Sequence, residues 1–267
     1  MIDVDKLFEK YLRDYLAQNA GKFSDDELED KVSELYESFG KTRSAELGGV
    51  TPEEYFSSKT PGELAQCLKE CVVSGTAVSD FLCEAIEKCD DIDKYLISFV
   101  SEGIDDELSA YCVNLLNDRG SKECFDKYLE LILSGKCDEN LTELLTETLS
   151  SDADKIADKV VSVYDNAENA KQYLIEILVN ASARDEIFDI LCKEFVGHDD
   201  NIALYTSYLA KYGDERALPL LKDKIKDESL SYVDYKELKL AIEELGGEYV
   251  DERDFSKDKY YSILKKN

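Results

Sequence analysis

The chain has 267 residues, of which 60 are acidic and 32 basic, and its formal net charge is −28. A surface of that sign repels phosphate, which argues against binding to nucleic acid or to an anionic membrane and favours a basic partner, a metal cation or solubility alone. Three prolines and 13 glycines are too few for the many tight turns of a β-sandwich or barrel, and they suit helices joined by short turns.

The first 60 residues predict a helical cap. Apolar side chains recur at three-and-four spacing over residues 4–16, the pattern of one helix face. Ser24 followed by Glu27 matches a capping box at the start of a second helix, which Gly40 ends. The two helices are expected to form a hairpin.

Two further helix starts follow, at Thr51 and Thr60. Each threonine precedes a proline and, three residues on, a glutamate, which is the order of N-cap, first helical residue and capping-box partner. We place a boundary near the second start. The predicted domains are an N-terminal helical hairpin or cap (1–60), a helical repeat array (61–250) and a C-terminal tail (251–267).

The array is predicted from regular spacing. Helical segments are expected to begin near residues 63, 78, 92, 105, 121, 138, 152, 167, 183, 200, 215 and 232. The interval is about 15 residues, so a helix pair takes about 30, which is typical of repeat proteins. The fold class is therefore all-α, an α-solenoid of antiparallel helix pairs in which each pair packs against its neighbours. An irregular helical bundle is the alternative.

One segment, residues 200–227, resembles a HEAT-like repeat of the variety found in phycobilisome-lyase-type HEAT proteins. In that pattern a Gly-Asp turn ends one helix, and an alanine with an apolar-Pro-x-Leu sequence opens the next. The matching residues are Gly213, Asp214, Ala217, Leu218, Pro219 and Leu221. The resemblance implies a HEAT-like or ARM-like superhelix that acts as a protein-interaction scaffold, although some relatives assist enzymes.

Basic residues are unevenly distributed between the two helices of each pair. The expected first helices (105–118, 138–149, 167–180 and 199–212) contain only Lys171 and Lys211, whereas the second helices (121–134, 152–165, 183–196 and 215–227) contain ten lysines and arginines. In a solenoid the two sets line opposite surfaces, so one face is predicted to be acidic. Such a face steers a partner of opposite charge. The other interpretation is that core packing leaves the first helices few exposed positions.

Tyr205, Tyr208 and Tyr212 are the candidate partner-binding residues, because their spacing places them on one side of a helix. Tyrosine is favoured at interfaces, where its ring supplies area and its hydroxyl a polar tip, but it also fills helical cores. The aromatic and lysine-rich carboxy end is expected to dock on the last repeat as a cap.

Catalytic and cofactor motifs are weak. Gly40-Lys41-Thr42 lacks the second glycine and the preceding strand of a phosphate-binding loop. Residues 25–29 match one acidic motif of terpene synthases without the second motif. The pairs Asp90-Asp91, Asp105-Asp106 and Asp199-Asp200 are interpreted as helix caps.

The eight cysteines are expected to be free thiols, because no two of them form the C-x-x-C pair common in zinc sites. Cys192 is six residues from His198, the only histidine, and we interpret that histidine as a loop residue. The first residues lack the features of a signal peptide and no apolar run is long enough to span a bilayer, so a cytoplasmic protein is expected.

The sequence therefore predicts a non-catalytic scaffold that binds a protein with a basic patch, with no cofactor, metal or catalytic residue assigned. The alternative is an all-helical enzyme or enzyme subunit whose acidic cleft binds a metal or a cationic substrate. A third interpretation is an acidic mimic of nucleic acid.

Overall fold

The structure is a computed structural model that describes residues 2–20, 22–23, 25–103, 105–250, 253–256, 258, 261 and 263; for residues 25–29 it describes the backbone alone. The regular secondary structure of these residues is helical, apart from one isolated bridge between Ser44 and Val50. The all-α prediction is confirmed. The chain divides into two compact units, residues 1–124 and residues 125–267. The predicted boundary near residue 60 lies inside unit 1 and stays a prediction.

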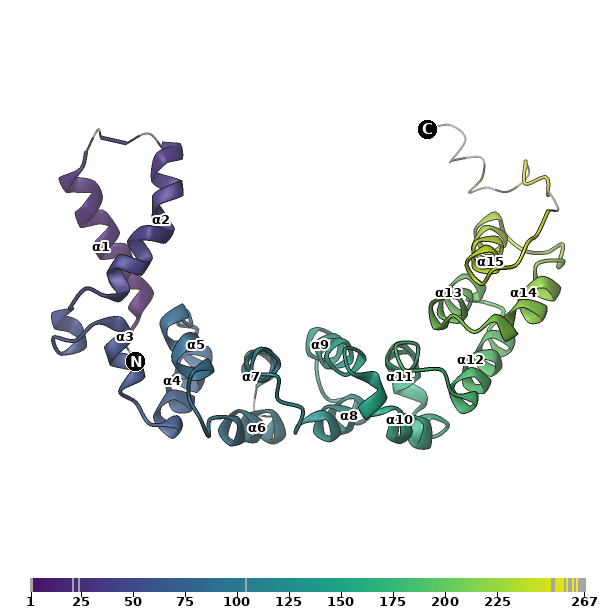
Figure 1. Ribbon diagram of the computed structural model, residues 1–267, viewed down its shortest axis with the longest axis horizontal. Coiled ribbons are helices and arrows are strands. Elements are labelled where there is room, and N and C mark those ends of the chain that lie inside the picture. The colour runs from purple at the N-terminus through teal and green to yellow at the C-terminus, as the bar shows by residue number, and fades with distance from the viewer. Residues whose placement is uncertain are drawn as a thin grey trace. The chain divides into compact units, whose positions relative to one another are not determined.

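The described part of unit 1 contains seven α-helices and a short 3-10 helix, shown from purple to blue in Figure 1. They are α1 (Val4–Gln18), α2 (Asp25–Gly40), η1 (Ala45–Leu47), α3 (Pro52–Ser57), α4 (Pro61–Ser74), α5 (Asp80–Glu87), α6 (Asp93–Glu102) and α7 (Asp106–Asp118). Helix α1 packs against α2, and α4 packs against α5, α6 and α7. The core of this unit therefore forms around α4.

The two threonine capping boxes of unit 1 are confirmed. The backbone N–H of Glu54 donates to Thr51 Oγ1 at 3.1 Å, and that of Glu63 donates to Thr60 Oγ1 at 3.4 Å. Each glutamate carboxylate accepts from its threonine N–H in return. The capping box predicted at Ser24 lies outside the described residues.

Gly40 ends α2, as predicted, but its main role is to leave room for a ring. A Cβ built on Gly40 would lie 2.5 Å from Cε1 of Phe81, closer than two such carbons approach. The Phe81 ring is buried and stacks on Tyr36, with 4.7 Å between ring centroids. The glycine therefore allows α2 and α5 to approach each other.

Unit 2 contains eight α-helices and three short 3-10 helices in its described part. They are α8 (Phe125–Ser134), α9 (Glu139–Ser150), η2 (Ala153–Lys155), α10 (Ala157–Tyr164), η3 (Glu168–Ala170), α11 (Lys171–Leu178), α12 (Asp185–Gly197), α13 (Ile202–Tyr212), η4 (Glu215–Ala217), α14 (Leu218–Lys224) and α15 (Tyr232–Glu244). The predicted helix starts in this region agree with these elements. The regular period therefore located the helices correctly.

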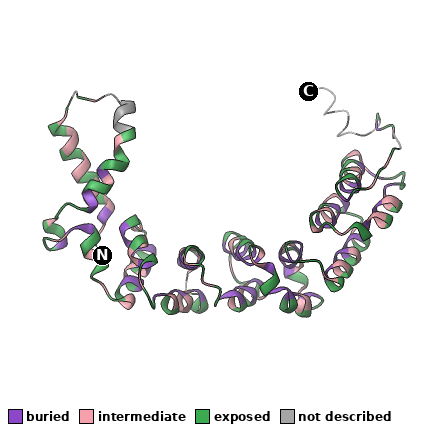
Figure 2. Ribbon diagram, in the orientation of Figure 1, coloured by how far each residue is buried: buried purple, intermediate pink, exposed green. Residues whose placement is uncertain are grey.

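The helices of unit 2 form pairs, in which α8 packs against α9, α10 against α11, α12 against α13, and α14 against α15. We call α9, α11, α13 and α15 the first row, and α8, α10, α12 and α14 the second row; Figure 1 shows the members of each row following one another. Contacts within the first row join α9 to α11 and α13 to α15. In Figure 2, buried and exposed stretches alternate around the helices, because each helix packs one face against its neighbours.

The turn that carries the sequence resemblance has the expected local geometry. Gly213 follows α13 with φ of +77°, a left-handed conformation that favours glycine. Pro219 lies in the first turn of α14, where its missing N–H has no partner to lose.

Described residues of the carboxy end pack on the last helix pair. The Phe255 ring is buried and lies 5.0 Å from that of Tyr235 and 5.4 Å from that of Tyr232, both on α15. The Arg253 guanidinium donates to the carbonyl of Ile225, which follows α14. This segment therefore covers part of both helices.

Candidate functional site

Five basic residues of the second row form ion pairs with carboxylates 25 to 33 positions earlier in the chain, on or beside the preceding helices. Asp126 on α8 pairs with Lys159 on α10, and Asp165 pairs with Lys193 on α12 at 2.7 Å. The same arrangement continues along the row with the pairs Asp158–Arg184, Asp185–Arg216 and Asp199–Lys224. We call these five pairs the ion-pair ladder. The mixed charge of the second row is thus largely neutralised within unit 2.

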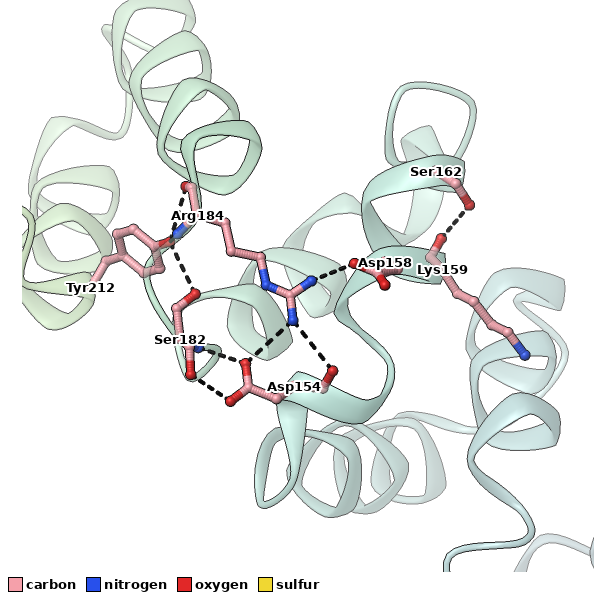
Figure 3. Close-up of polar contacts among 7 residues, drawn as sticks. All are labelled: Asp154, Asp158, Lys159, Ser162, Ser182, Arg184 and Tyr212. Atoms are coloured by element: carbon pink, nitrogen blue, oxygen red, sulfur yellow. Dashed lines mark hydrogen bonds and ion pairs between the residues drawn. The ribbon is translucent and has the colours of Figure 1, made fainter.

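Arg184 belongs to the ladder and also to a polar network in the loop before α12 (Figure 3). Its guanidinium lies between Asp154 and Asp158, and the Asp154 carboxylate also accepts from the backbone N–H of Ser182 at 2.8 Å. Hydrogen bonds from the Ser182 hydroxyl and N–H, together with the Arg184 charge, lower the pKa of Asp154 below its ordinary value of 3.8. Tyr212 on α13 supports the same loop, because its hydroxyl oxygen accepts from the Arg184 N–H at 2.7 Å.

The part of this pKa lowering that comes from the Arg184 charge predicts a pH dependence for Arg184→Gln, since the Ser182 hydrogen bonds remain in the variant. We expect the variant to have a lower free energy of unfolding than the unmodified protein at pH 7, and the gap to narrow as the pH falls through and below 3.8. A carboxylate with a depressed folded-state pKa stabilises the fold above its ordinary pKa and loses that effect as the pH falls through the folded-state value. Urea unfolding at pH 7, 5 and 3 measures the gap.

The matched control is Lys222→Gln on α14, whose side chain has no ion pair among the described contacts. It should leave the free energy of unfolding unchanged at each pH. A gap for Arg184→Gln that stays constant with pH would show that the arginine acts through packing alone.

The first row carries an open groove of about 650 Å³ between α9, α11 and α13. We call it the acidic groove, and its lining residues are Glu143, Thr146, Glu147, Ser150, Ser151, Glu176, Asn180, Leu204, Tyr208 and Lys211. Three consecutive members of the row contribute to it. It is therefore built by the repeated packing of the unit.

The carboxylates of the acidic groove have no ion pairs within the described residues. Glu143 and Glu147 lie one turn apart on α9 and are exposed. Neither they nor Glu176 on α11 has an ion pair in the described part of the chain. Lys211 is the one basic lining residue. The groove carboxylates thus differ from those of the ion-pair ladder, each of which has a basic partner.

Tyr208 forms the bridge between α13 and α11 in this groove. Its hydroxyl donates to Oε1 of Glu176 at 3.2 Å, and its side chain is 7% exposed. Burial, with the Glu176 carboxylate next in importance, raises the pKa of Tyr208, so the phenol keeps its proton and remains a donor. The Glu176 carbonyl is held as well, accepting from Ser150 Oγ at 3.2 Å and from Asn180 Nδ2 at 2.6 Å.

The three candidate tyrosines therefore have different surroundings. Only Tyr208 lines the acidic groove. Tyr205 is half-buried, and its ring stacks on His198 with 4.6 Å between centroids. Tyr212 holds the Arg184 loop. A partner-binding role for these three stays a prediction.

His198 belongs to a polar cluster around Glu194, the one charged residue classed as buried among those described. Glu194 on α12 is 4% exposed; its carboxylate lies 3.3 Å from His198 Nδ1 and 3.6 Å from the Lys171 ammonium on α11. Tyr164, buried on α10, is beside it, and burial followed by the Glu194 charge raises the pKa of that phenol. Cys192 is half-buried and has no described contact with His198.

Of the Asp-Asp pairs interpreted as helix caps, only one has that role. Asp105 caps α7, accepting from the Leu108 N–H at 2.8 Å. The interpretation is wrong for Asp90-Asp91, since the N-cap of α6 is Ile92 without a side-chain bond. It is also wrong at α13, where Asn201 precedes the helix and Asp199 pairs with Lys224 instead, an interaction that required the next helix to be in place.

None of the eight cysteines, all of them among the described residues, is in a disulfide; Cys71, Cys112 and Cys124 are buried and the other five are half-buried. Burial raises the pKa of Cys112 to about 12. The part of the chain that the structure describes contains no group of three or more His, Cys, Asp or Glu side chains arranged to hold a metal ion. Nor does any helix there combine the length and apolar character needed to cross a bilayer.

Sequence reasoning anticipated the acidic character of the first row and named Lys211 as one of its two basic residues, but it did not single out Glu143, Glu147 or Glu176. The scarcity of lysine in the first helices indicated the face. The selection among its many acids required knowledge of which side chains the helix packing leaves exposed. Neither a known protein family, nor a curated protein, nor a solved structure matches the chain.

Proposed function

We propose that the chain is a HEAT-like α-solenoid scaffold that binds a protein partner carrying a basic patch, and that the acidic groove is the centre of the binding surface. The observation that carries this proposal is the set of unpaired carboxylates Glu143, Glu147 and Glu176 around an open groove. The paired helices of unit 2 and the period of about 30 residues support a repeat architecture.

The contrast between the ion-pair ladder and the groove carboxylates supports a role for the acidic charge beyond solubility. Basic residues are present in unit 2, and five of them pair with carboxylates in the ladder. The groove carboxylates stay without such pairs among the described residues. Unpaired charge of one sign steers a partner of the opposite sign and selects against partners of the same sign.

The competing proposal, an enzyme with an acidic cleft, requires a carboxylate in an apolar, closed pocket where its pKa is raised for acid–base chemistry. Glu143 and Glu147 are exposed on one helix face. That environment suits recognition of a cationic surface better than proton transfer.

The test compares two variants with the same change in charge. The groove variant is Glu143→Gln/Glu147→Gln/Glu176→Gln. The control variant is Glu186→Gln/Asp189→Asn/Glu228→Gln, which changes three exposed acids elsewhere in unit 2 that have no described ion pair. Each protein is immobilised, exposed to a lysate of the source cells and eluted with a salt gradient, and the eluted proteins are identified by mass spectrometry.

We expect a basic protein to be captured by the unmodified chain and by the control variant, and to be at least about tenfold depleted on the groove variant. It should elute at moderate salt, because the Debye length is about 8 Å at 0.15 M and shrinks further along the gradient. Equal capture by all three proteins would remove the acidic groove as the binding surface.

A further inference from the structure

The acidic groove differs in charge from one side to the other. Its carboxylates come from α9 and α11, whereas α13 contributes Leu204, the ring of Tyr208 and the Lys211 ammonium. Leu204 is half-buried, so part of its side chain is open to a ligand. A complementary ligand therefore has one cationic group on the carboxylate side and an aliphatic group over Leu204 and Tyr208.

Helix ends add to the negative potential of the groove. Ser150 is the last residue of α9, and Asn180 lies just beyond the end of α11. Neither helix has a basic residue in its last turn, so the partial negative charge of these C-terminal ends is not offset there. In α13 the last turn contains Lys211, which offsets it. The cation-binding side is thus the side of α9 and α11.

The volume sets the size of the ligand. About 650 Å³ is within the range of pockets that hold a small molecule or a few side chains, far less than a folded domain occupies. Arginine suits this site better than lysine, because its planar guanidinium has five N–H donors that can meet two carboxylates at once and can stack on an aromatic ring. The Tyr208 hydroxyl engages only Oε1 of Glu176 among the described contacts, which leaves acceptor capacity on that carboxylate.

We propose that the acidic groove binds a short peptide segment in which a single arginine adjoins an aliphatic residue. The guanidinium sits among Glu143, Glu147 and Glu176, and the aliphatic side chain covers Leu204 and Tyr208. Lys211 repels a second cation on the α13 side, so the groove selects one arginine over a run of basic residues. This inference rests on the proposed function and specifies the part of the partner that the groove recognises.

The test uses a blocked eight-residue peptide, Gly-Ser-Gly-Leu-Arg-Ser-Gly-Gly, titrated into the ¹⁵N-labelled full chain and followed by NMR. Two control peptides replace its arginine with citrulline, which keeps the shape without the charge, or its leucine with serine. We expect shifts confined to the amides of residues 143–151, 176–180 and 204–211. The citrulline peptide should bind at least about tenfold more weakly, and the serine peptide several-fold more weakly.

Two substitutions in the groove should change the dissociation constant of the peptide in opposite directions. Glu147→Gln should raise the dissociation constant about tenfold, since it removes one partner of a charge-assisted hydrogen bond. Lys211→Gln should lower it several-fold, because the repulsive charge is gone. Glu186→Gln, on α12 in the second row, changes the net charge as Glu147→Gln does and should leave the constant unchanged.

The inference would be overturned if Glu147→Gln and Glu186→Gln weakened peptide binding equally, or if the NMR shifts spread over the other acidic surfaces. Binding would then follow net charge alone. A peptide that produces no shifts would also overturn the inference. In either case a partner lost from the groove variant but retained by the control variant would still support the proposed function. Capture that is equal on both variants would remove the proposed function whatever the peptide does.

Discussion

Replacing Lys171 with methionine is expected to lower the free energy of unfolding of unit 2 by about 3 kcal/mol. The lysine ammonium lies 3.6 Å from the carboxylate of Glu194, which is 4% exposed. Removing one partner of a buried pair leaves a charge with poor solvation, and such losses are about 3–5 kcal/mol. The lower end of that range applies here because the lysine is partly exposed and His198 remains beside the carboxylate.

Urea unfolding followed by circular dichroism measures this loss. The matched control is Lys211→Met, an exposed lysine on α13 without an ion pair among the described contacts, and it should change the stability by less than about 0.5 kcal/mol. The double variant Lys171→Met/Glu194→Met should recover most of the loss, because an apolar pair leaves no buried charge. A loss below about 1 kcal/mol for Lys171→Met would mean that the lysine does not stabilise Glu194.

The second large effect is expected for Gly40→Ala, which should destabilise unit 1 by about 1–3 kcal/mol, the usual cost of overpacking. Gly40 is in α2 with no positive φ, so alanine would ordinarily stabilise a helix there by up to about 1 kcal/mol. At this position alanine should destabilise the fold instead, because the new Cβ would meet the Phe81 ring at 2.5 Å and that ring is held by its stack on Tyr36.

Gly62→Ala provides the comparison for this prediction. Gly62 is also helical, and its Cβ would make an ordinary contact of 3.4 Å with the Tyr95 hydroxyl. This variant should be neutral or slightly stabilising in the same urea titration. Replacing the ring with a smaller side chain, in the double variant Gly40→Ala/Phe81→Leu, should recover part of the stability lost in Gly40→Ala. If Gly40→Ala proved as stable as Gly62→Ala, the close approach of α2 and α5 would not depend on the glycine.

The sequence predicted most of the helices because their signals are local. Thr51 and Thr60 cap their helices through residues three positions away, and the period of the array is a property of neighbouring segments. The same local reasoning misassigned Asp199. Its carboxylate was expected to cap the next helix, but it binds Lys224, a residue 25 positions along the chain. Whether such a carboxylate caps the next helix or pairs with a lysine cannot be decided without knowing how the following helix pair packs.

In the candidate site, too, the sequence predicted what depends on local signals and not what depends on packing. The scarcity of basic residues on the first helices was visible in the sequence, and so was the tyrosine series of α13. Periodicity places a residue on a helix face but does not give its exposure, which depends on the neighbouring helix. Glu147 is exposed while Glu194 is buried, although both are glutamates in amphipathic helices. Glu194 is buried beside two partners, Lys171 on α11 and His198 at the end of its own helix.

The ion-pair ladder also has a consequence for how unit 2 folds. Its five pairs join residues only 25 to 33 positions apart, so each can form once two successive helix pairs are made. Contacts that are local in sequence require little loop closure, and chains rich in them fold rapidly. Folding of unit 2 can therefore start at any helix pair and extend to its neighbours. Each new helix pair is then held in register by the ion pairs that it forms with the preceding helix pair.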